Sequence, residues 1–317
     1  MPTEIKLKDQ ISRQSVQPVS PAIHALADTL LVTYGEAVQA ILFYGSCLRT
    51  GDDRGGLVDL YLIVDSYPAA FPKSILSTFN RLLPPNVFYL EGPFEDRSVR
   101  AKYAVLSLGD FTRGTSRRWF HSYLWGRFAQ PVGLIYARND QITRCIQHAL
   151  AQAVLTFIGR VLPVVPSPFT ARDLWRVGLR LSYRAELRAE RPEKLARLFE
   201  AEPDFYEKIT RSAIESLPFP VEIEQTDSAY LYTSDISDRT RWLCRIDWMV
   251  RCCQGKLISI LRLLKGWLTF RGGVNYILWK IERHSGEKID VSPRLKRYPL
   301  IATCVILWRL YRRGAYR

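Results

Sequence analysis

The sequence predicts an α+β fold, in which strands with flanking helices are followed by a helical unit and a basic amphipathic C-terminal region. Two apolar runs, 41–44 and 60–64, have the composition of buried strands, and a glycine turn with a polar excursion separates them. The segment 170–216 instead has a helical and highly charged pattern. Strands in the first half and helices in the second are typical of the α+β class.

Composition predicts a globular protein with an anionic partner. The 317 residues are 47% hydrophobic and 24% charged, which excludes a disordered chain, and they are enough for two domains. The net charge of +14 favours nucleic acid, nucleotide or acidic lipid as the partner. Most of the excess lies in 251–317, where 15 Lys or Arg residues stand against three acidic ones.

The cysteines and the N-terminus predict a protein that works in a reducing cytoplasm. The six cysteines are scattered without C-x-x-C spacing, and only four histidines are present, so neither disulfides nor zinc are expected. Residues 1–20 are interpreted as a disordered or loosely docked leader, because they are polar and end in prolines. This leader has no apolar core, and Glu4 and Asp9 argue against a transit peptide.

Residues 21–165 are predicted to form the first domain. A helix over 21–35 ends at Gly35 and leads into the strand at 41–44. After the second strand, periodicity and proline pairs predict, in order, a helix at 73–83, strands at 86–90 and 100–108, and helices at 110–131 and 139–162. A cluster of three prolines, at 163, 166 and 168, then marks the domain boundary.

Residues 166–250 are predicted to form a small helical domain. Thr170 is a candidate N-cap, with Asp173 three residues later. Arginines recur every fourth residue from Arg172 to Arg188, either as a solvated face or as an anion-binding one. Residues 218–237 have the composition of a polar connector.

Residues 251–317 are predicted to form a basic region that associates with membranes. Leucines and a tryptophan accompany cations at 256–270, and 300–311 is apolar, but both runs are shorter than the ~20 residues of a membrane-spanning helix. Each run is expected either to lie in the lipid headgroup plane or to pack on the body as an ordinary helix.

The candidate site lies at the turn between the first two strands. Gly45 lets the backbone approach a bound group closely, and Ser46 adds a hydroxyl beside free backbone N–H groups, so the turn can hold phosphates. Asp59 opens the second strand within reach of the same pocket, and a carboxylate beside a phosphate site suggests Mg²⁺. A Gly-Ser pair is also compatible with an ordinary turn.

The sequence leaves the second metal ligand open. Asp59 and Tyr61 alternate along a strand and share a face, and a tyrosine cannot replace a carboxylate as a Mg²⁺ ligand. Asp65 has the right parity but lies about 20 Å further along an extended strand. Asp52 and Asp53 in the intervening loop are the other candidates.

Two further positions carry candidate cations. Lys102, near the start of the strand at 100–108, can neutralise a triphosphate or a leaving pyrophosphate, or can be a solvated strand end. Trp119, Tyr123, Gly126 and Arg127 follow at helical spacing, which predicts that they share one side of a helix, an arrangement typical of a core.

These motifs resemble two related groups of enzymes. Gly-Ser, a spacer and Asp59 resemble polymerase-β-like nucleotidyltransferases, whose motif continues as Asp-x-Asp or Asp-x-Glu, whereas Tyr61 follows here. From about Ala37 to Lys280 the chain resembles the mitochondrial-type, peripheral phosphatidate cytidylyltransferases, which likewise lack the second acidic position. The matching motifs, in chain order, are Tyr44-Gly45-Ser46; Val58-Asp59-Leu60 with Ile63-Val64-Asp65; Ala101 to Val105; Trp119, Tyr123, Gly126, Arg127 and Pro131; Leu181-Ser182-Tyr183 with Arg188; and 256–280. Ala104 and Gln130 depart from the family's glycine and lysine.

The resemblance implies a polymerase-β-like nucleotidyltransferase domain with a mixed sheet. It implies transfer of a cytidylyl group from CTP to phosphatidic acid, which gives CDP-diacylglycerol and pyrophosphate in phospholipid biosynthesis. Asp59 and Lys102 would be catalytic, and Mg²⁺ would be held by Asp59 with Asp65 or a loop aspartate. The nucleotide contacts would come from Tyr44, Gly45, Ser46, Arg127, Ser182 and Tyr183.

The resemblance also implies a bacterial relative of the mitochondrial enzyme, peripheral on the inner face of the cytoplasmic membrane, with an anionic membrane surface as partner. No nucleic-acid partner is expected, because the apolar runs near 256 and 300 favour lipid over RNA. Two alternatives stay open: a nucleotidyltransferase with a soluble or RNA acceptor, and a membrane-bound scaffold that has lost catalysis, which Tyr61 suggests.

Overall fold

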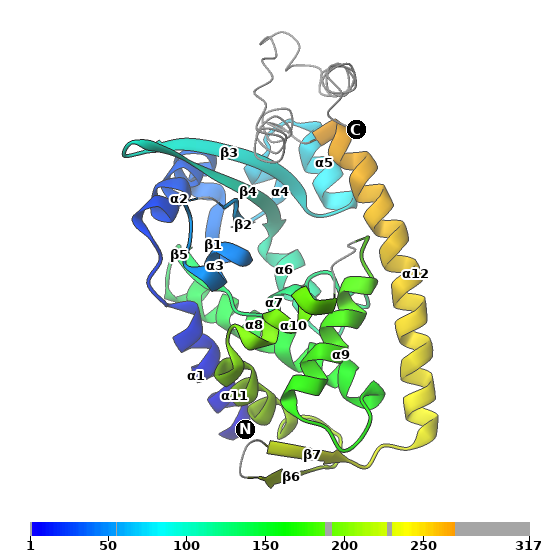
Figure 1. Ribbon diagram of the computed structural model, residues 1–317. Helices are drawn as coiled ribbons and strands as arrows, with labels where there is room; N and C mark the ends of the chain where they lie inside the picture. The colour runs from blue at the N-terminus through cyan, green and yellow to red at the C-terminus, as the bar shows by residue number, and fades with distance from the viewer. Residues whose placement is uncertain (1, 55, 188–191, 227–229, 270–317) are drawn as a thin grey trace, which may run out of the picture.

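A mixed five-stranded sheet with helices on both faces builds the first half of the molecule (Figure 1). The computed structural model describes residues 2–54, 56–187, 192–226 and 230–269. The strands of this sheet are β1 (Val38–Tyr44), β2 (Val58–Val64), β3 (Asn86–Phe94), β4 (Arg97–Ser107) and β5 (Gly133–Ala137). Their order is β3-β4-β2-β1-β5, with β2 and β4 parallel and the other neighbours antiparallel. The predicted α+β class with a mixed sheet is therefore confirmed.

The two faces of the sheet bury different side chains, because alternate residues of a strand point in opposite directions. One face carries Leu60 and Leu62 and is covered by α2 (Pro21–Tyr34), α4 (Tyr67–Ala70) and α5 (Ile75–Leu82). The other carries Tyr61 and Ile63 and is covered by α6 (Leu108–Thr115), α7 (Trp125–Phe128) and α8 (Asp140–Val161). A short 3-10 helix, η1 (Gly35–Ala37), connects α2 to β1.

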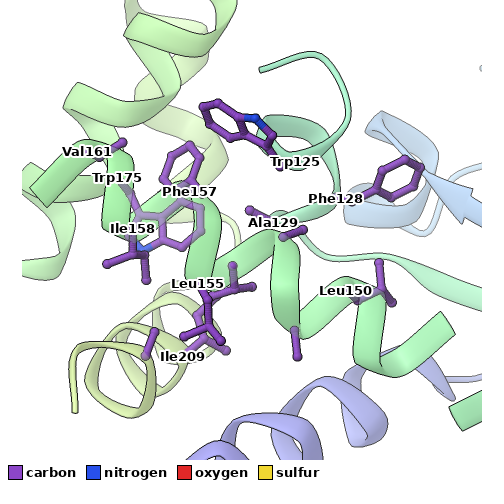
Figure 2. Close-up of a cluster of buried hydrophobic side chains, with 14 of the residues drawn as sticks. Trp125, Phe128, Ala129, Leu150, Leu155, Phe157, Ile158, Val161, Trp175 and Ile209 are labelled. Carbon is purple, nitrogen blue, oxygen red and sulfur yellow. The ribbon is translucent and has the colours of Figure 1, made fainter. Parts of the chain in front are cut away.

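The long helix α8 joins the sheet to the helices that follow. By length and hydropathy the segment Asp140–Val164 is apolar enough to cross a membrane, but 67% of its apolar window is buried inside the protein. It packs against η2 (Leu162–Val164), α9 (Ala171–Arg184) and α11 (Pro203–Ile214). One continuous cluster therefore extends from the sheet into the helical unit, and it includes Trp125, Phe157 and Trp175 (Figure 2).

Local signals for the start of the helical unit are confirmed. The hydroxyl of Thr170 accepts the N–H of Asp173, and the Asp173 carboxylate accepts the N–H of Thr170, which is a complete capping box for α9. Arg172, Arg176, Arg180 and Arg184 are exposed, which is compatible with both interpretations of this row, and Arg188 lies outside the described residues. The unit continues with α10 (Pro192–Glu200) and α11.

Three predictions of local structure are wrong. The leader contains α1 (Pro2–Ser15), because Leu7 and Ile11 are buried and α1 packs on α8 and α11. The connector at 218–237 contains a hairpin of β6 (Val221–Gln225) and β7 (Tyr230–Ser234).

The helix predicted over 110–131 is two short helices, α6 and α7, with a non-helical segment between them. Carbonyls that would bond within a helix accept side-chain donors instead. The carbonyl of Trp119 accepts from the indole of Trp125, and that of Phe120 accepts from Arg251 Nε. The helical spacing of the aromatic residues therefore reflects tertiary contacts and not a helix.

The last described element, α12 (Asp238–Thr269), runs along one side of the molecule from the β6–β7 hairpin to α5 (Figure 1). The boundary expected between 250 and 251 falls inside this helix. The segment 256–270 is helical as far as Thr269. Residues 270–317, with the apolar run at 300–311, lie outside the described residues.

A substitution of Trp175 tests whether the buried cluster that extends from the sheet into the helical unit stabilises the protein. It is fully buried, stacks on Phe157 at 4.5 Å between ring centroids, and donates to Thr210 Oγ1 at 2.7 Å. We expect Trp175→Ala to lower the free energy of unfolding by about 3–5 kcal/mol, measured by urea denaturation. Trp242→Ala, at a site 60% exposed, is the control and should change it by less than about 0.5 kcal/mol. Equal effects would contradict a core that extends from the sheet into the helices.

Candidate functional site

The candidate site is a pocket at the end of β1 and β2, between the sheet, α7 and α10. Its walls include residues from both halves of the molecule. The lining residues are Tyr44, Gly45, Ser46, Arg49, Asp59, Arg127, Gln130, Pro131, Tyr183, Leu195 and Leu198. The structure therefore brings together six of the predicted residues from four separate stretches of the sequence: Tyr44, Gly45 and Ser46, then Asp59, Arg127 and Tyr183.

The glycine turn and the carboxylate are in direct contact at the floor of this pocket. Tyr44 pairs with Asp59 at the end of the β1–β2 ladder, so Gly45 continues alongside the aspartate. Gly45 has a φ of +90°, and a Cβ at this position would lie 2.7 Å from Asp59 Oδ2. Only glycine fits such a conformation and such a contact. The next residue, Ser46, begins the short helix α3 (Ser46–Thr50).

Lys102 is adjacent to the pocket and is paired with Asp59. The two residues are neighbours in the parallel β2–β4 register, and Lys102 Nζ lies 3.0 Å from Asp59 Oδ1. Both side chains are partly exposed, at 30% and 22%, so a bound anion can reach them. The two predicted catalytic residues are therefore a direct ion pair.

Tyr61 stands where related motifs have a second acidic residue, and it holds a cation instead. Its hydroxyl accepts from Arg127 Nη1 at 2.8 Å and donates to the Tyr123 hydroxyl at 3.3 Å. Arg127 Nη2 also lies 3.4 Å from Glu186 Oε2. Burial acts to lower the pKa of Arg127, but Tyr61, Tyr123 and Glu186 outweigh it, so the pKa is raised well above its usual value. Arg127 therefore stays charged at the pocket wall.

Sequence reasoning gave no site role to five lining residues: Arg49, Gln130, Pro131, Leu195 and Leu198. Arg49 on α3 places a second guanidinium in the pocket, and among the residues that the structure describes no side-chain hydrogen bond or ion pair joins this guanidinium to another residue. Leu195 and Leu198 of α10 form an apolar wall, and Pro131 lies beside Gln130. The amphipathic pattern of 192–200 was the available signal for the leucines, whereas nothing in the local sequence distinguishes Arg49 from other surface arginines.

Two predicted site residues lie elsewhere. Asp65 follows the opposite end of β2 from Asp59 and is exposed, so the two carboxylates, about 20 Å apart along the strand, cannot share a metal. Ser182 is buried against α7, where its Cβ lies 3.0 Å from the place that a Cβ of Gly126 would take, and its hydroxyl donates to the Leu179 carbonyl. Ser182 therefore sets the distance between α7 and α9 and does not line the pocket.

The loop aspartates are also committed elsewhere. Asp53 is 9% exposed, pairs with Arg97 at 2.9 Å and accepts from the Ser20 hydroxyl. Asp52 is exposed and accepts the backbone N–H of Arg54. Within the described ranges no three His, Cys, Asp or Glu side chains gather as a metal cage. The donor set at the pocket, one carboxylate beside a phosphate-sized turn, fits Mg²⁺ held jointly with substrate phosphates.

Comparisons with known proteins identify a family that this chain matches. The family model described as "Phosphatidate cytidylyltransferase, mitochondrial" matches residues 66–243, which include Lys102, Arg127 and Tyr183. No curated protein sequence gives a significant match. Among solved structures, a nucleotidyltransferase-like protein from Exiguobacterium sibiricum aligns with 67% of this chain and 99% of its own, at 10% identity and a TM-score of 0.27. The match to the family model confirms the resemblance drawn from the sequence motifs.

The contact between Gly45 and Asp59 is testable through stability. Gly51 is the matched control, because it also has a positive φ, +67°, but a Cβ there would meet nothing within 4 Å. We expect Gly51→Ala to cost about 1–2 kcal/mol from backbone conformation alone. Gly45→Ala should cost about 1–3 kcal/mol more, because the methyl group displaces the carboxylate. Equal free energies of unfolding in urea titrations would contradict the contact.

Proposed function

Because the chain belongs to the mitochondrial phosphatidate cytidylyltransferase family, we propose that it transfers a cytidylyl group from CTP to phosphatidic acid in phospholipid biosynthesis. The family match begins at residue 66 and so leaves out the glycine turn and Asp59. The observation that carries the proposal is the pocket itself, in which Gly45, Ser46 and Asp59 lie opposite Arg127 and Tyr183 from the matched region.

In the proposed reaction a phosphate oxygen of phosphatidic acid attacks the α-phosphorus of CTP. The new bond joins that oxygen to phosphorus, and the bond between the α-phosphorus and the bridging oxygen breaks, so pyrophosphate leaves with the electron pair. CDP-diacylglycerol is the other product. Such transfers need alignment and charge stabilisation more than covalent participation by the protein.

The residues of the pocket have distinct roles in this scheme. Gly45 and Ser46 offer backbone N–H groups and a hydroxyl to the terminal phosphates, and Arg49 on the same turn neutralises the leaving pyrophosphate. Arg127 faces the transferred phosphoryl group, and Tyr44 and Tyr183 supply aromatic surface for the nucleoside. Lys102, which pairs with Asp59 at 3.0 Å and is partly exposed, transfers its contact to a substrate phosphate when substrate enters.

Asp59 is the proposed Mg²⁺ ligand, together with phosphate oxygens of the substrate. When bound, the ion would neutralise charge that develops on the phosphates during transfer. In related motifs a second acidic residue helps to hold metal, which brings positive charge to the phosphates. Here Lys102 supplies positive charge beside Asp59 directly. Tyr61 is compatible with activity in this scheme, because it holds Arg127 at the pocket.

The proposed lipid acceptor requires a membrane, and α12 has a surface suited to it. Apolar side chains are exposed along its outward side: Trp242, Leu243, Met249, Val250, Leu257, Ile260, Leu261, Leu263 and Leu264. From Trp242 to Leu264 the stripe is about 33 Å long. Arg245 and Lys256 are exposed on the same helix and suit anionic headgroups. This surface supports our proposal that the protein is peripheral on a membrane, with the inner face of the bacterial cytoplasmic membrane as the proposed location.

Two alternatives predict different behaviour. A nucleotidyltransferase with a soluble or RNA acceptor would use the same pocket but would not need the apolar stripe on α12. A membrane-bound scaffold without catalysis would keep the stripe but would gain no stability from CTP, whereas an enzyme that binds CTP is stabilised by it.

Asp59 and Asp65 form a matched pair for testing the reaction. Purified protein with labelled CTP, Mg²⁺ and phosphatidic acid in mixed micelles should produce lipid-soluble label. We expect Asp59→Asn to lower kcat by about 10²–10³-fold, because the charge that holds the metal is lost. Asp65→Asn, at the far end of β2, should retain the wild-type rate. EDTA should stop the reaction. If the wild-type protein leaves the lipid unlabelled but transfers label to RNA, the first alternative is favoured.

The membrane surface is testable by flotation with vesicles that contain phosphatidic acid. We expect wild-type protein to float and the double variant Leu257→Glu/Ile260→Glu to remain in the soluble fraction, because charges on the stripe oppose insertion. Val32→Glu is the control, since Val32 is 88% exposed on α2 and lies off the stripe. Flotation of the double variant at the wild-type level would show that another surface binds lipid.

A further inference from the structure

The helix α12 has an inverted distribution of polarity. Its outward side is apolar, whereas the side that faces the body buries the cations Arg251 and Lys265, with Arg262 largely covered as well. Burying a cation is costly unless specific partners compensate it. Each of these buried cations therefore requires polar or aromatic partners on the body of the protein.

Arg262 packs on a tyrosine that also contacts the pocket arginine. Its guanidinium carbon lies 3.8 Å from the centre of the Tyr123 ring, and that of Arg127 lies 4.4 Å from the same centre. The Tyr123 hydroxyl also accepts a hydrogen bond from the Tyr61 hydroxyl, which in turn accepts one from Arg127. An unbroken series of contacts thus joins α12 to the pocket wall through Tyr123.

The backbone after α5 keeps Arg262 in place. Three successive carbonyls face α12: Pro84 accepts from Arg262 Nε at 2.9 Å, and Leu83 and Pro85 accept from Lys265 Nζ. These bonds fix both the position of the helix and the direction of the Arg262 side chain. The Nη1 atom of Arg262 is buried without a hydrogen-bond partner among the described residues, so the stack on Tyr123 is a main contact of this guanidinium.

Electrostatics support a link between the two arginines. Burial acts to raise the pKa of Tyr123, but Arg127 and Arg262 outweigh it and lower the pKa to about 8. The negative face and hydroxyl of this ring thus reduce the repulsion between two buried cations. Glu186 pairs with Arg127 on the side toward α9.

We propose that Arg262 is a positioning residue, which holds Arg127 in the pocket by packing against Tyr123. This inference rests on the proposed function, in which Arg127 binds phosphate, and it gives α12 a second role besides facing the membrane. Loss of Arg262 would free Tyr123 to shift, and Arg127 would lose the surface that directs its guanidinium toward the ligand.

A binding experiment tests this role without any need for turnover. Inorganic pyrophosphate is the probe, and calorimetry measures its Kd with the full-length chain. We expect Arg262→Gln to raise the Kd about tenfold, and Tyr123→Leu to do the same, whereas Tyr123→Phe keeps the ring and should change it less. Arg262→Lys should recover part of the affinity, because an ammonium group also packs on an aromatic face.

A double-variant cycle separates positioning from general loosening. In an Arg127→Lys background, Arg262→Gln should add little, because the group that it positions is gone. Arg251→Met is the matched control: Arg251 is a buried arginine on the same helix, caged by Phe120, Trp125 and Trp248, so its loss should lower Tm but leave the Kd within about twofold.

The outcomes also separate this inference from the proposed reaction. Additive effects of Arg262→Gln and Arg127→Lys, an equal loss of affinity in Arg251→Met, or no pyrophosphate binding by the wild type would each overturn the positioning role. A wild-type protein that binds pyrophosphate with the expected variant pattern, but transfers no label from CTP to lipid, would sink the proposed reaction and leave the role of Arg262 intact.

Discussion

The buried guanidinium of Arg127 is the interaction on which the organisation of the site depends. It is 8% exposed and lies where the sheet, α7 and the end of α9 meet. A buried cation must be compensated, and here the compensation comes from the Tyr61 hydroxyl, Glu186 and two aromatic rings, those of Tyr44 and Tyr123. Each partner comes from a different element, so holding this one charge brings the walls of the pocket together.

The same requirement explains why a tyrosine follows Asp59 at the second position of the strand. With a carboxylate at position 61, the pocket would carry two adjacent anions and would depend on metal to offset them. With Tyr61, Asp59 pairs with Lys102, and Arg127 is hydrogen bonded to the phenol instead. Positive charge then surrounds the Gly45–Ser46 turn from Arg49, Lys102 and Arg127, which suits a polyphosphate ligand.

Much of the local structure was predictable, because its signals lie within a few residues of one another. The capping box of Thr170 and Asp173, the strands around the glycine turn and the extent of α8 all follow from short-range rules. The failures have a common cause. Trp119 and Tyr123 have helical spacing, yet Phe120 and Trp119 give their carbonyls to side chains from elsewhere, and Leu7 and Ile11 make α1 a packed helix through contacts with α8 and α11. The spacing of apolar residues along the chain indicates which side chains are buried, but it does not identify the element against which they pack.

By itself the sequence determined the α+β class, the family and the chemical character of Gly45, Ser46, Asp59 and Arg127. Those features depend on residue type and on spacing along the chain. Only the tertiary structure decided which of these residues meet: it paired Lys102 with Asp59, brought Arg49 into the pocket, removed Asp65 and Ser182 from it, and set Arg262 against Tyr123. The physical reason is that a parallel strand pair and a 32-residue helix join positions far apart in the chain, and no local pattern encodes their register.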